Sequence, residues 1–93
     1  MKLEFDNLKD LLKFNVKYYR YLNNLSQEKL AELCSLSTRY LTDIERGIHY
    51  PTINKIEKIA SALNLEPFEL FQNPDRDPDL INKIMSSRQY NQK

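Results

Sequence analysis

The stretch that decides the fold runs from Leu25 to Gly47 and reads LSQEKLAELCSLSTRYLTDIERG. Each half of it opens on a serine, Ser26 or Ser37, whose side-chain oxygen is suited to capping the first free backbone amides of a helix. The pattern predicts two short helices, 27–34 and 38–46, and the only glycine of the chain ends the second. This stretch therefore predicts two helices joined by a tight turn.

The apolar residues of the stretch are spaced so that they meet between the two helices: Leu30, Ala31, Cys34, Leu36, Leu41 and Ile44. When Leu41 and Ile44 point inward, helical geometry gives the second helix an opposite face that is wholly polar. That face comprises Thr38, Arg39, Thr42, Asp43 and Arg46. A polar helix face beside a helix N-terminus with free amides is suited to entering a DNA major groove while the other helix holds a phosphate.

Helical spacing continues on both sides of this stretch. Residues 7–23 repeat apolar side chains at helical intervals, a second amphipathic pattern follows Thr52, and Pro67 is suited to the first position of a short helix. With one glycine and four prolines in 93 residues, the chain has too few turn-forming residues for a protein of many strands. The sequence predicts an all-α fold.

The C-terminal part of the chain predicts one more helix. Residues 73–78 have the composition of a linker, and 79–93 read as an amphipathic helix with a polar tail. The apolar residues of this helix are Leu80, Ile81, Ile84 and Met85. A second apolar stripe on helix 7–23 comprises Leu11, Phe14, Tyr18 and Tyr21. We expect the two sets to pack together, within one chain or between two chains; the alternative is that the tyrosines stay half exposed.

Length and composition argue against several classes of function. A chain of 93 residues and 11.1 kDa buries about 65% of its unfolded surface in one core, which favours a binding or regulatory module over an enzyme. The single cysteine, Cys34, and the single histidine, His49, supply neither a disulfide nor a cluster of metal ligands. One histidine without a partner nucleophile supports no catalysis. We expect no enzyme activity, no metal and no cofactor.

The N-terminus and the charge distribution add two expectations. Residues 1–6 lack the apolar run of a signal peptide, and no stretch approaches the roughly 20 apolar residues of a membrane span, so we expect a cytoplasmic protein without membrane contact. The net charge is only +1, but residues 13–58 hold eight Lys and Arg against five Asp and Glu, an excess of +3. The centre of the chain is its basic part.

Taken together, these residues resemble the helix-turn-helix domain of Cro and phage-repressor type, also called the XRE family. The resemblance covers about residues 13–71 and is carried by Leu25–Glu28, Leu30–Ala31, Ser37, Ile44–Gly47, Pro51, Ile59–Ala60, Leu63 and Leu70–Phe71. It implies a five-helix lambda-repressor-like domain over 1–72 with a motif core at 27–46, here followed by the additional C-terminal helix. It also implies a homodimer that binds a palindromic site in double-stranded DNA.

The resemblance further implies roles for single residues. Positions at the start of the helix 38–46 and one turn later read base edges, which assigns that role to Thr38, Arg39, Thr42 and Asp43. Asp43 would accept a hydrogen bond from a cytosine amino group. Gln27 falls where the family contacts phosphate. By their own chemistry Tyr40 and Arg46 are further candidates for phosphate contacts, although Tyr40 fits the edge of the core equally well. Arg20 and Glu45 match a partly buried ion pair that some members of the family form.

The chain departs from the family pattern at two places. Ser35 stands at the turn position that is usually glycine, so it must adopt a positive φ or the turn must differ. The loop 48–50 reads Ile-His-Tyr where the family is often basic, which leaves the loop itself without a strong phosphate anchor.

Two classes of function remain open at this point. The first is a sequence-specific transcriptional regulator, a repressor rather than an activator, and a restriction-modification controller protein is a variant with similar size and a similar segment at 40–42. The second is a protein-interaction module, such as an antitoxin-like partner, which the modest charge excess of the central region permits. Salt-sensitive DNA binding that Arg39→Ala abolishes would favour the first class, and a co-purifying protein would favour the second.

Overall fold

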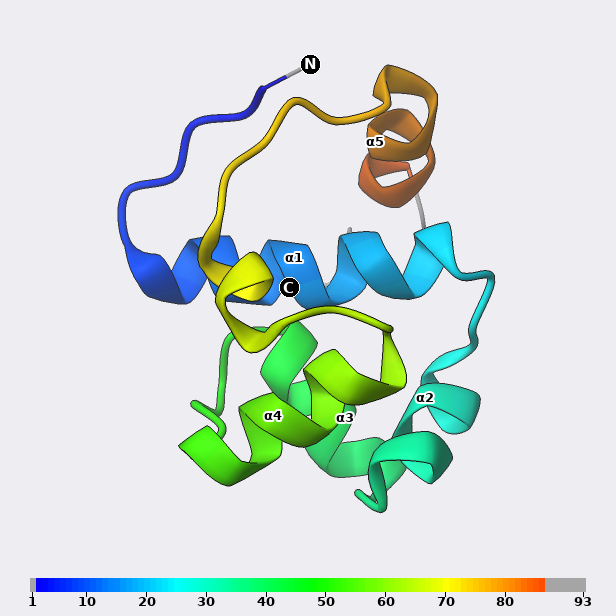
Figure 1. Ribbon diagram of the computed structural model, residues 1–93. Coiled ribbons are helices and arrows are strands. Elements are labelled where there is room, and N and C mark those ends of the chain that lie inside the picture. The colour runs from blue at the N-terminus through cyan, green and yellow to red at the C-terminus, as the bar shows by residue number, and fades with distance from the viewer. Residues whose placement is uncertain (1, 87–93) are drawn as a thin grey trace.

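The computed structural model describes residues 2–86, and over these residues it consists of helices joined by short connections (Figure 1). In chain order they are α1 (Leu8–Leu22), α2 (Gln27–Cys34), α3 (Thr38–Glu45), α4 (Ile53–Ala62), the 3-10 helix η1 (Pro67–Phe71) and α5 (Pro78–Met85). No strand occurs among the described residues. The prediction of an all-α fold is confirmed, and the fifth helix is a short 3-10 helix.

Side-chain caps begin the helices at the predicted places. Ser26, Ser37 and Thr52 each accept a hydrogen bond from the backbone amide three residues later, at 3.0, 3.0 and 3.3 Å. At η1, Glu66 and Glu69 form a reciprocal capping box in front of the proline. These caps satisfy amides that a helix leaves free at its start, which is why the boundaries agree with the sequence pattern.

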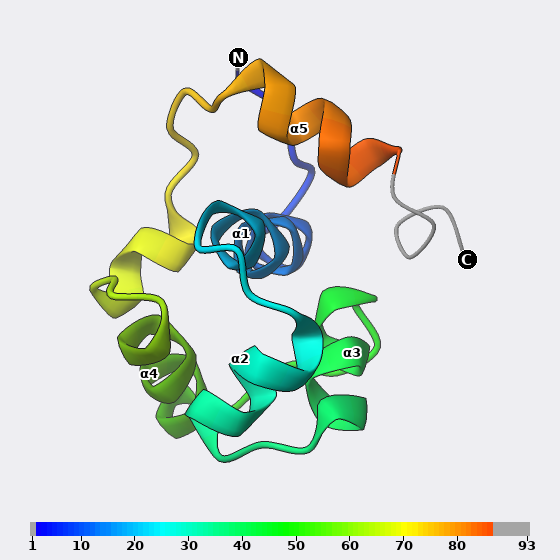
Figure 2. The same cartoon turned by 90° about the vertical axis from the view of Figure 1, so that its right-hand side faces the viewer.

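The helix α1 lies between two apolar cores, and Figure 2 shows it nearly end-on with α5 on one side and α2, α3 and α4 on the other. The larger core is formed by Leu12, Val16, Leu30, Ala31, Cys34, Leu41, Ile44, Ile59, Ala60, Leu63 and Leu70. Asn15 ties α1 to the end of this core, because its buried amide donates to the carbonyls of Leu70 and Gln72 at 2.7 and 2.9 Å. The larger core thus joins every element of the predicted helix-turn-helix domain.

The smaller core forms where the second stripe of α1 meets α5. Phe14 and Tyr18 are buried against Ile81 and Ile84, and Tyr21, Leu80 and Met85 are partly buried around them. Leu11 is buried as well, at 8% exposure. The stripe therefore packs against α5 within one chain, and Tyr21, Leu80 and Met85 keep part of their surface exposed.

The linker before α5 is held in place by an arginine among aromatic rings. The Arg76 guanidinium lies 5.9, 5.2 and 5.0 Å from the ring centroids of Phe5, Phe14 and Tyr18. Arg76 is 3% exposed, and this burial lowers the pKa of its guanidinium. Next to it, the backbone amide of Asp77 donates to Tyr18 Oη at 3.1 Å. The linker thus anchors α5 over α1.

The start of α5 differs by one residue from the sequence prediction. The helix begins at Pro78, inside the predicted linker 73–78, because the Asp77 carboxylate accepts from the Asp79 amide at 3.0 Å and proline is tolerated at a first helical position. The predicted polar tail lies outside the described residues after Ser86. Among the helices of residues 2–86, none combines the length and apolar character that crossing a membrane requires.

Candidate nucleic-acid interface

A tight turn fixes the position of α3 relative to α2. Ser35 has φ +58° and ψ +39°, so it adopts the left-handed conformation that glycine supplies more readily. The amides of Ser35 and Leu36 donate to the carbonyls of Glu32 and Ala31 at 3.1 and 2.9 Å. The departure from the family pattern is therefore accommodated by strain at one serine, and the turn keeps its geometry.

A buried ion pair joins α1 to the end of α3. Arg20 Nε and Nη2 donate to the two carboxylate oxygens of Glu45 at 2.7 and 2.9 Å, and Arg20 Nη1 donates to the Leu25 carbonyl at 2.9 Å. Burial alone would lower the pKa of Arg20, but the hydrogen bonds and charge of Glu45 outweigh it and the pKa is raised. The side chains are 6% and 0% exposed. The expected structural pair is present.

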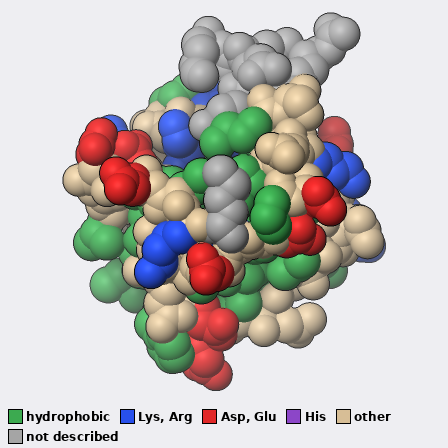
Figure 3. Space-filling view, turned by 90° about the horizontal axis from the view of Figure 1, so that it is seen from above, with side chains coloured by type: hydrophobic (Ala, Val, Ile, Leu, Met, Phe, Trp, Pro, Cys, Tyr) green, Lys and Arg blue, Asp and Glu red, His purple; other side chains and the backbone are tan. Residues whose placement is uncertain are grey.

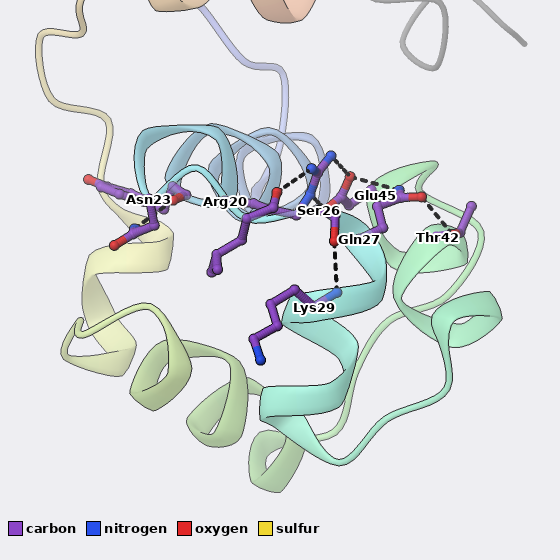
Figure 4. Close-up of polar contacts among 9 residues, drawn as sticks. Arg20, Asn23, Ser26, Gln27, Lys29, Thr42 and Glu45 are labelled. Atoms are coloured by element: carbon purple, nitrogen blue, oxygen red, sulfur yellow. Dashed lines mark hydrogen bonds and ion pairs between the residues drawn. The ribbon is translucent and has the colours of Figure 1, made fainter.

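The same carboxylate holds the first residue of α2 (Figure 4). Gln27 Nε2 donates to Glu45 Oε1 at 3.1 Å, and Thr42 Oγ1 donates to Gln27 Oε1 at 3.1 Å. Gln27 thus lies between Glu45 and Thr42, with its side chain fixed by α3. Sequence reasoning placed Gln27 and Thr42 on the DNA-facing side but missed this link between them.

The outer face of α3 carries most of the residues expected there. The Arg39 side chain is 84% exposed, Arg46 is exposed at the helix C-cap, and Thr38 and Thr42 are half-buried. Tyr40 is also half-buried and packs against the larger core, which places it at the core edge. Its ring stacks on His49 with the centroids 5.4 Å apart.

The prediction that Asp43 lies on the exposed face is wrong. Asp43 is 6% exposed, and its Oδ2 lies 3.4 Å from Arg39 Nε and 3.5 Å from His49 Nε2. The reason is the loop that follows α3: the Asp43 carbonyl accepts from the amides of Ile48 and His49 at 2.8 and 3.3 Å, which folds the loop back over the side chain. Asp43 therefore faces the loop and does not present its carboxylate on the exposed face of α3.

Lysines from other helices lie near the loop that follows α3. Lys55 Nζ of α4 lies 5.0 Å from the Tyr40 ring centroid, and Lys9 Nζ of α1 lies 5.3 Å from that of Tyr50. Lys13 of α1 lies so close to Gly47, which has φ +79°, that a Cβ added to the glycine would be 3.0 Å from Lys13 Cδ. Helical spacing puts Lys9 and Lys13 on one face, but only the tertiary fold brings that face to the loop.

Other parts of the described surface offer weaker candidates. The face that carries α5 mixes basic, acidic and apolar side chains without one dominant charge (Figure 3). Between residues 2 and 86, no three His, Cys, Asp or Glu side chains gather in a way that could hold a metal ion. Cys34 is buried in the larger core, and this burial raises the pKa of its thiol to about 11. The candidate site is therefore the exposed face of α3 with the start of α2.

Comparison with known proteins agrees with this geometry. A helix-turn-helix family matches residues 16–70, which is more than half of the chain. The control protein C.BamHI of Bacillus amyloliquefaciens is 48% identical over 48 residues, covering 52% of this chain and 59% of that relative. This chain thus aligns with less than two thirds of that relative's length.

Two crystal structures share the fold. A hypothetical transcription factor from Neisseria superposes with a TM-score of 0.72 at 28% identity, covering 91% of this chain and 93% of that one. The restriction-modification controller protein C.AhdI of Aeromonas hydrophila has a TM-score of 0.63 at 42% identity, covering 67% and 97%. With the capped α2 and α3, the left-handed turn and the Arg20–Glu45 pair, the chain belongs to the helix-turn-helix family of Cro and phage-repressor (XRE) type, a family of transcriptional regulators.

Proposed function

We propose that this protein is a sequence-specific DNA-binding transcriptional regulator that binds a palindromic operator as a homodimer and represses transcription. The observation that carries the proposal is the exposed polar face of α3, led by Arg39, next to the capped start of α2. An arginine at the start of such a helix is suited to a bidentate hydrogen bond with guanine in the major groove. The function involves no catalysed reaction, metal or cofactor.

Base reading falls on three residues. The Arg39 side chain is 84% exposed, so its guanidinium can reach a base edge while Nε stays near Asp43. Thr38 lies beside it at the first position of α3, and Thr42 follows one turn later. Thr42 donates its hydroxyl proton to Gln27, so its oxygen keeps acceptor capacity for a base donor.

Phosphate contacts fall on residues at the margins of this face. Gln27 uses one of its two amide N–H donors on Glu45, and the second is available for a phosphate at the start of α2. Arg46 at the end of α3 and the hydroxyl of Tyr40 are further contacts. Lys55 lies over Tyr40 and supplies the positive charge that the loop lacks.

A dimer would place two α3 helices about 34 Å apart in successive major grooves. Since α5 covers most of the second stripe of α1, we place the dimer surface elsewhere. Large apolar side chains are exposed in the loop after α3 and at the start of α4, where Ile48, Tyr50 and Ile53 are 56%, 64% and 75% exposed. These residues adjoin the recognition helix, so a contact through them would couple the spacing of the two helices to DNA binding.

The similarity to two control proteins favours a controller of a restriction-modification system as the specific kind of regulator. Selection of binding sites from random duplex DNA at near-physiological salt tests the proposal on the wild type and on Arg39→Ala in parallel. We expect the wild type to enrich an inverted repeat and Arg39→Ala to lose or alter one base position in each half. Enrichment of nothing by a folded wild type, together with a co-purifying protein, would replace the proposal by an antitoxin-like interaction module.

A further inference from the structure

We propose that Asp43 is a positioning residue for DNA reading: its buried carboxylate orients the Arg39 guanidinium, and His49 competes for the same carboxylate oxygen. The inference rests on the proposed function and concerns how Arg39 is prepared for a base. Asp43 itself does not touch DNA, because it lies beneath the loop after α3.

The first step is the geometry of the pair. Arg39 and Asp43 are four residues apart on α3, and Arg39 Nε lies 3.4 Å from Asp43 Oδ2. The Arg39 side chain is 84% exposed, so packing against neighbouring side chains restricts it little. A long side chain loses rotamer freedom when it binds, and a carboxylate that holds its Nε in advance reduces that loss. The guanidinium Nη atoms remain available for a base edge.

The second step is that the stability of α3 does not explain an acidic residue at position 43. Asp43 lies in the last turn of α3, where the helix dipole disfavours a negative charge. Its Oδ1 atom is buried and, within residues 2–86, has no hydrogen-bond partner. A buried carboxylate oxygen without a partner costs stability, so the residue is better explained by what its other oxygen holds.

The third step is the competition from His49. His49 Nε2 lies 3.5 Å from the same Oδ2 atom, held there by its backbone contact to the Asp43 carbonyl. The charged groups around the imidazole come from three helices: Asp43 and Arg39 of α3, Lys55 of α4 across the Tyr40 ring, and Lys9 and Lys13 of α1 beside the loop. A neutral imidazole leaves the carboxylate to Arg39, whereas an imidazolium attracts it away.

The first experiment uses the free protein without DNA. We expect the NMR order parameter of the Arg39 Nε–Hε bond to fall in Asp43→Asn, and in the wild type as the pH is lowered from neutral. Arg46, an exposed arginine at the end of the same helix, is the internal control and should not respond. In His49→Gln the order parameter of Arg39 should stay high at the pH values where it falls in the wild type. An order parameter of Arg39 that is the same in the wild type and in Asp43→Asn overturns the inference.

The second experiment measures discrimination on the selected operator against an operator changed at the base pair that Arg39 reads. Asp43→Asn should lower this discrimination about two- to tenfold. It should also raise affinity for unrelated DNA, because a negative charge near the phosphates is removed. In an Arg39→Ala background, Asp43→Asn should leave discrimination unchanged. A purely structural role would instead lower thermal stability together with discrimination at base pairs that Arg39 does not read, and that result overturns the inference.

The two experiments separate this inference from the proposed function. If the Arg39 order parameter responds as expected but the wild type selects no DNA site, the proposed function fails and the role in reading DNA fails with it, while the contact between Asp43 and Arg39 stands. If a site is selected and Arg39→Ala alters it, but Asp43→Asn changes neither readout, the proposed function stands and the positioning role of Asp43 is wrong.

Discussion

Arg20 and Glu45 lie 25 positions apart and form a two-pronged ion pair whose side chains are 6% and 0% exposed. The pair connects the central helix α1 to the last residue of α3, and Glu45 also holds Gln27 at the start of α2. One carboxylate therefore fixes three helices relative to each other. The orientation of α3, the helix that we propose enters the DNA groove, therefore depends on a buried contact that DNA would not touch.

Removing one partner of this pair should be strongly destabilising. Arg20→Ala leaves the Glu45 carboxylate buried without its counter-charge, and we expect a loss of about 3–5 kcal/mol in the free energy of unfolding, measured by urea denaturation. Lys29→Ala is the matched control, since Lys29 and Glu32 form an exposed pair at 3.5 Å that should contribute less than about 1 kcal/mol. Equal effects of the two variants would contradict the stated role of the buried pair.

The smaller core should contribute to the stability of the protein. Its α5 residues lie outside residues 16–70, the region that the helix-turn-helix family matches. Ile84→Ala removes a fully buried side chain, so we expect a loss of about 2–5 kcal/mol, whereas Lys83→Ala on the exposed side of α5 should cost less than about 0.5 kcal/mol. Deleting residues 79–93 should lower the Tm. The solution mass of the shortened protein should still correspond to the same number of chains as in the wild type. An unchanged Tm after the deletion would show that α5 does not stabilise the domain.

The two positive-φ residues around α3 should respond to substitution in opposite directions. Ser35→Gly relieves a left-handed conformation that costs a side-chain-bearing residue about 1–2 kcal/mol, partly offset by the greater freedom of glycine in the unfolded chain, so stability should rise by up to about 1 kcal/mol. Gly47→Ala should lower it, because its φ is +79° and the new Cβ would press on Lys13. Thermal unfolding of both variants and of the wild type measures whether each substitution raises or lowers the stability.

The Cys34 thiol should make stability fall at high pH. Its pKa is raised by burial to about 11 in the folded protein, from an unfolded value of 9.0. Between these values the unfolded chain holds fewer protons than the folded one, so the free energy of unfolding decreases as the pH rises, by at most about 1.4 kcal/mol per pH unit. The contribution is fully present below pH 9. Comparison with Cys34→Ala between pH 8 and 11 isolates it from the tyrosines and lysines, and parallel curves would contradict it.

The fold was predictable because its boundaries are local. Ser26, Ser37 and Thr52 cap helices through contacts three residues away, and such contacts are visible in a sequence. The two stripes of α1 predicted two apolar contacts, but periodicity alone does not say whether α5 comes from the same chain. The structure supplies that answer through Phe14 and Tyr18.

The candidate site was only partly predictable because some of its contacts depend on a loop. Arg39 and Arg46 are exposed as helical geometry requires, but Asp43 is covered because the chain after Gly47 turns back and bonds to its carbonyl. The contact of Lys55 with Tyr40 likewise joins α4 to α3 through tertiary packing. Helical spacing assigns faces to one helix and does not report what another segment places on them.

The lysines around the loop give the last prediction, which concerns how DNA binding depends on salt. Lys55 lies over Tyr40 beside the recognition helix, so Lys55→Gln should remove one phosphate contact and reduce the slope of log affinity against log salt by about 0.9. Because a phosphate carries no base information, affinity should fall by a similar factor on the operator and on unrelated DNA. Lys83→Gln is the control, since Lys83 is exposed on α5, which lies on the other side of α1 from α3 (Figure 2). Titrations by fluorescence anisotropy at several salt concentrations measure both slopes. A slope changed by Lys83→Gln but not by Lys55→Gln would mean that DNA binds the α5 side of the protein and that the proposed DNA-binding face is wrong.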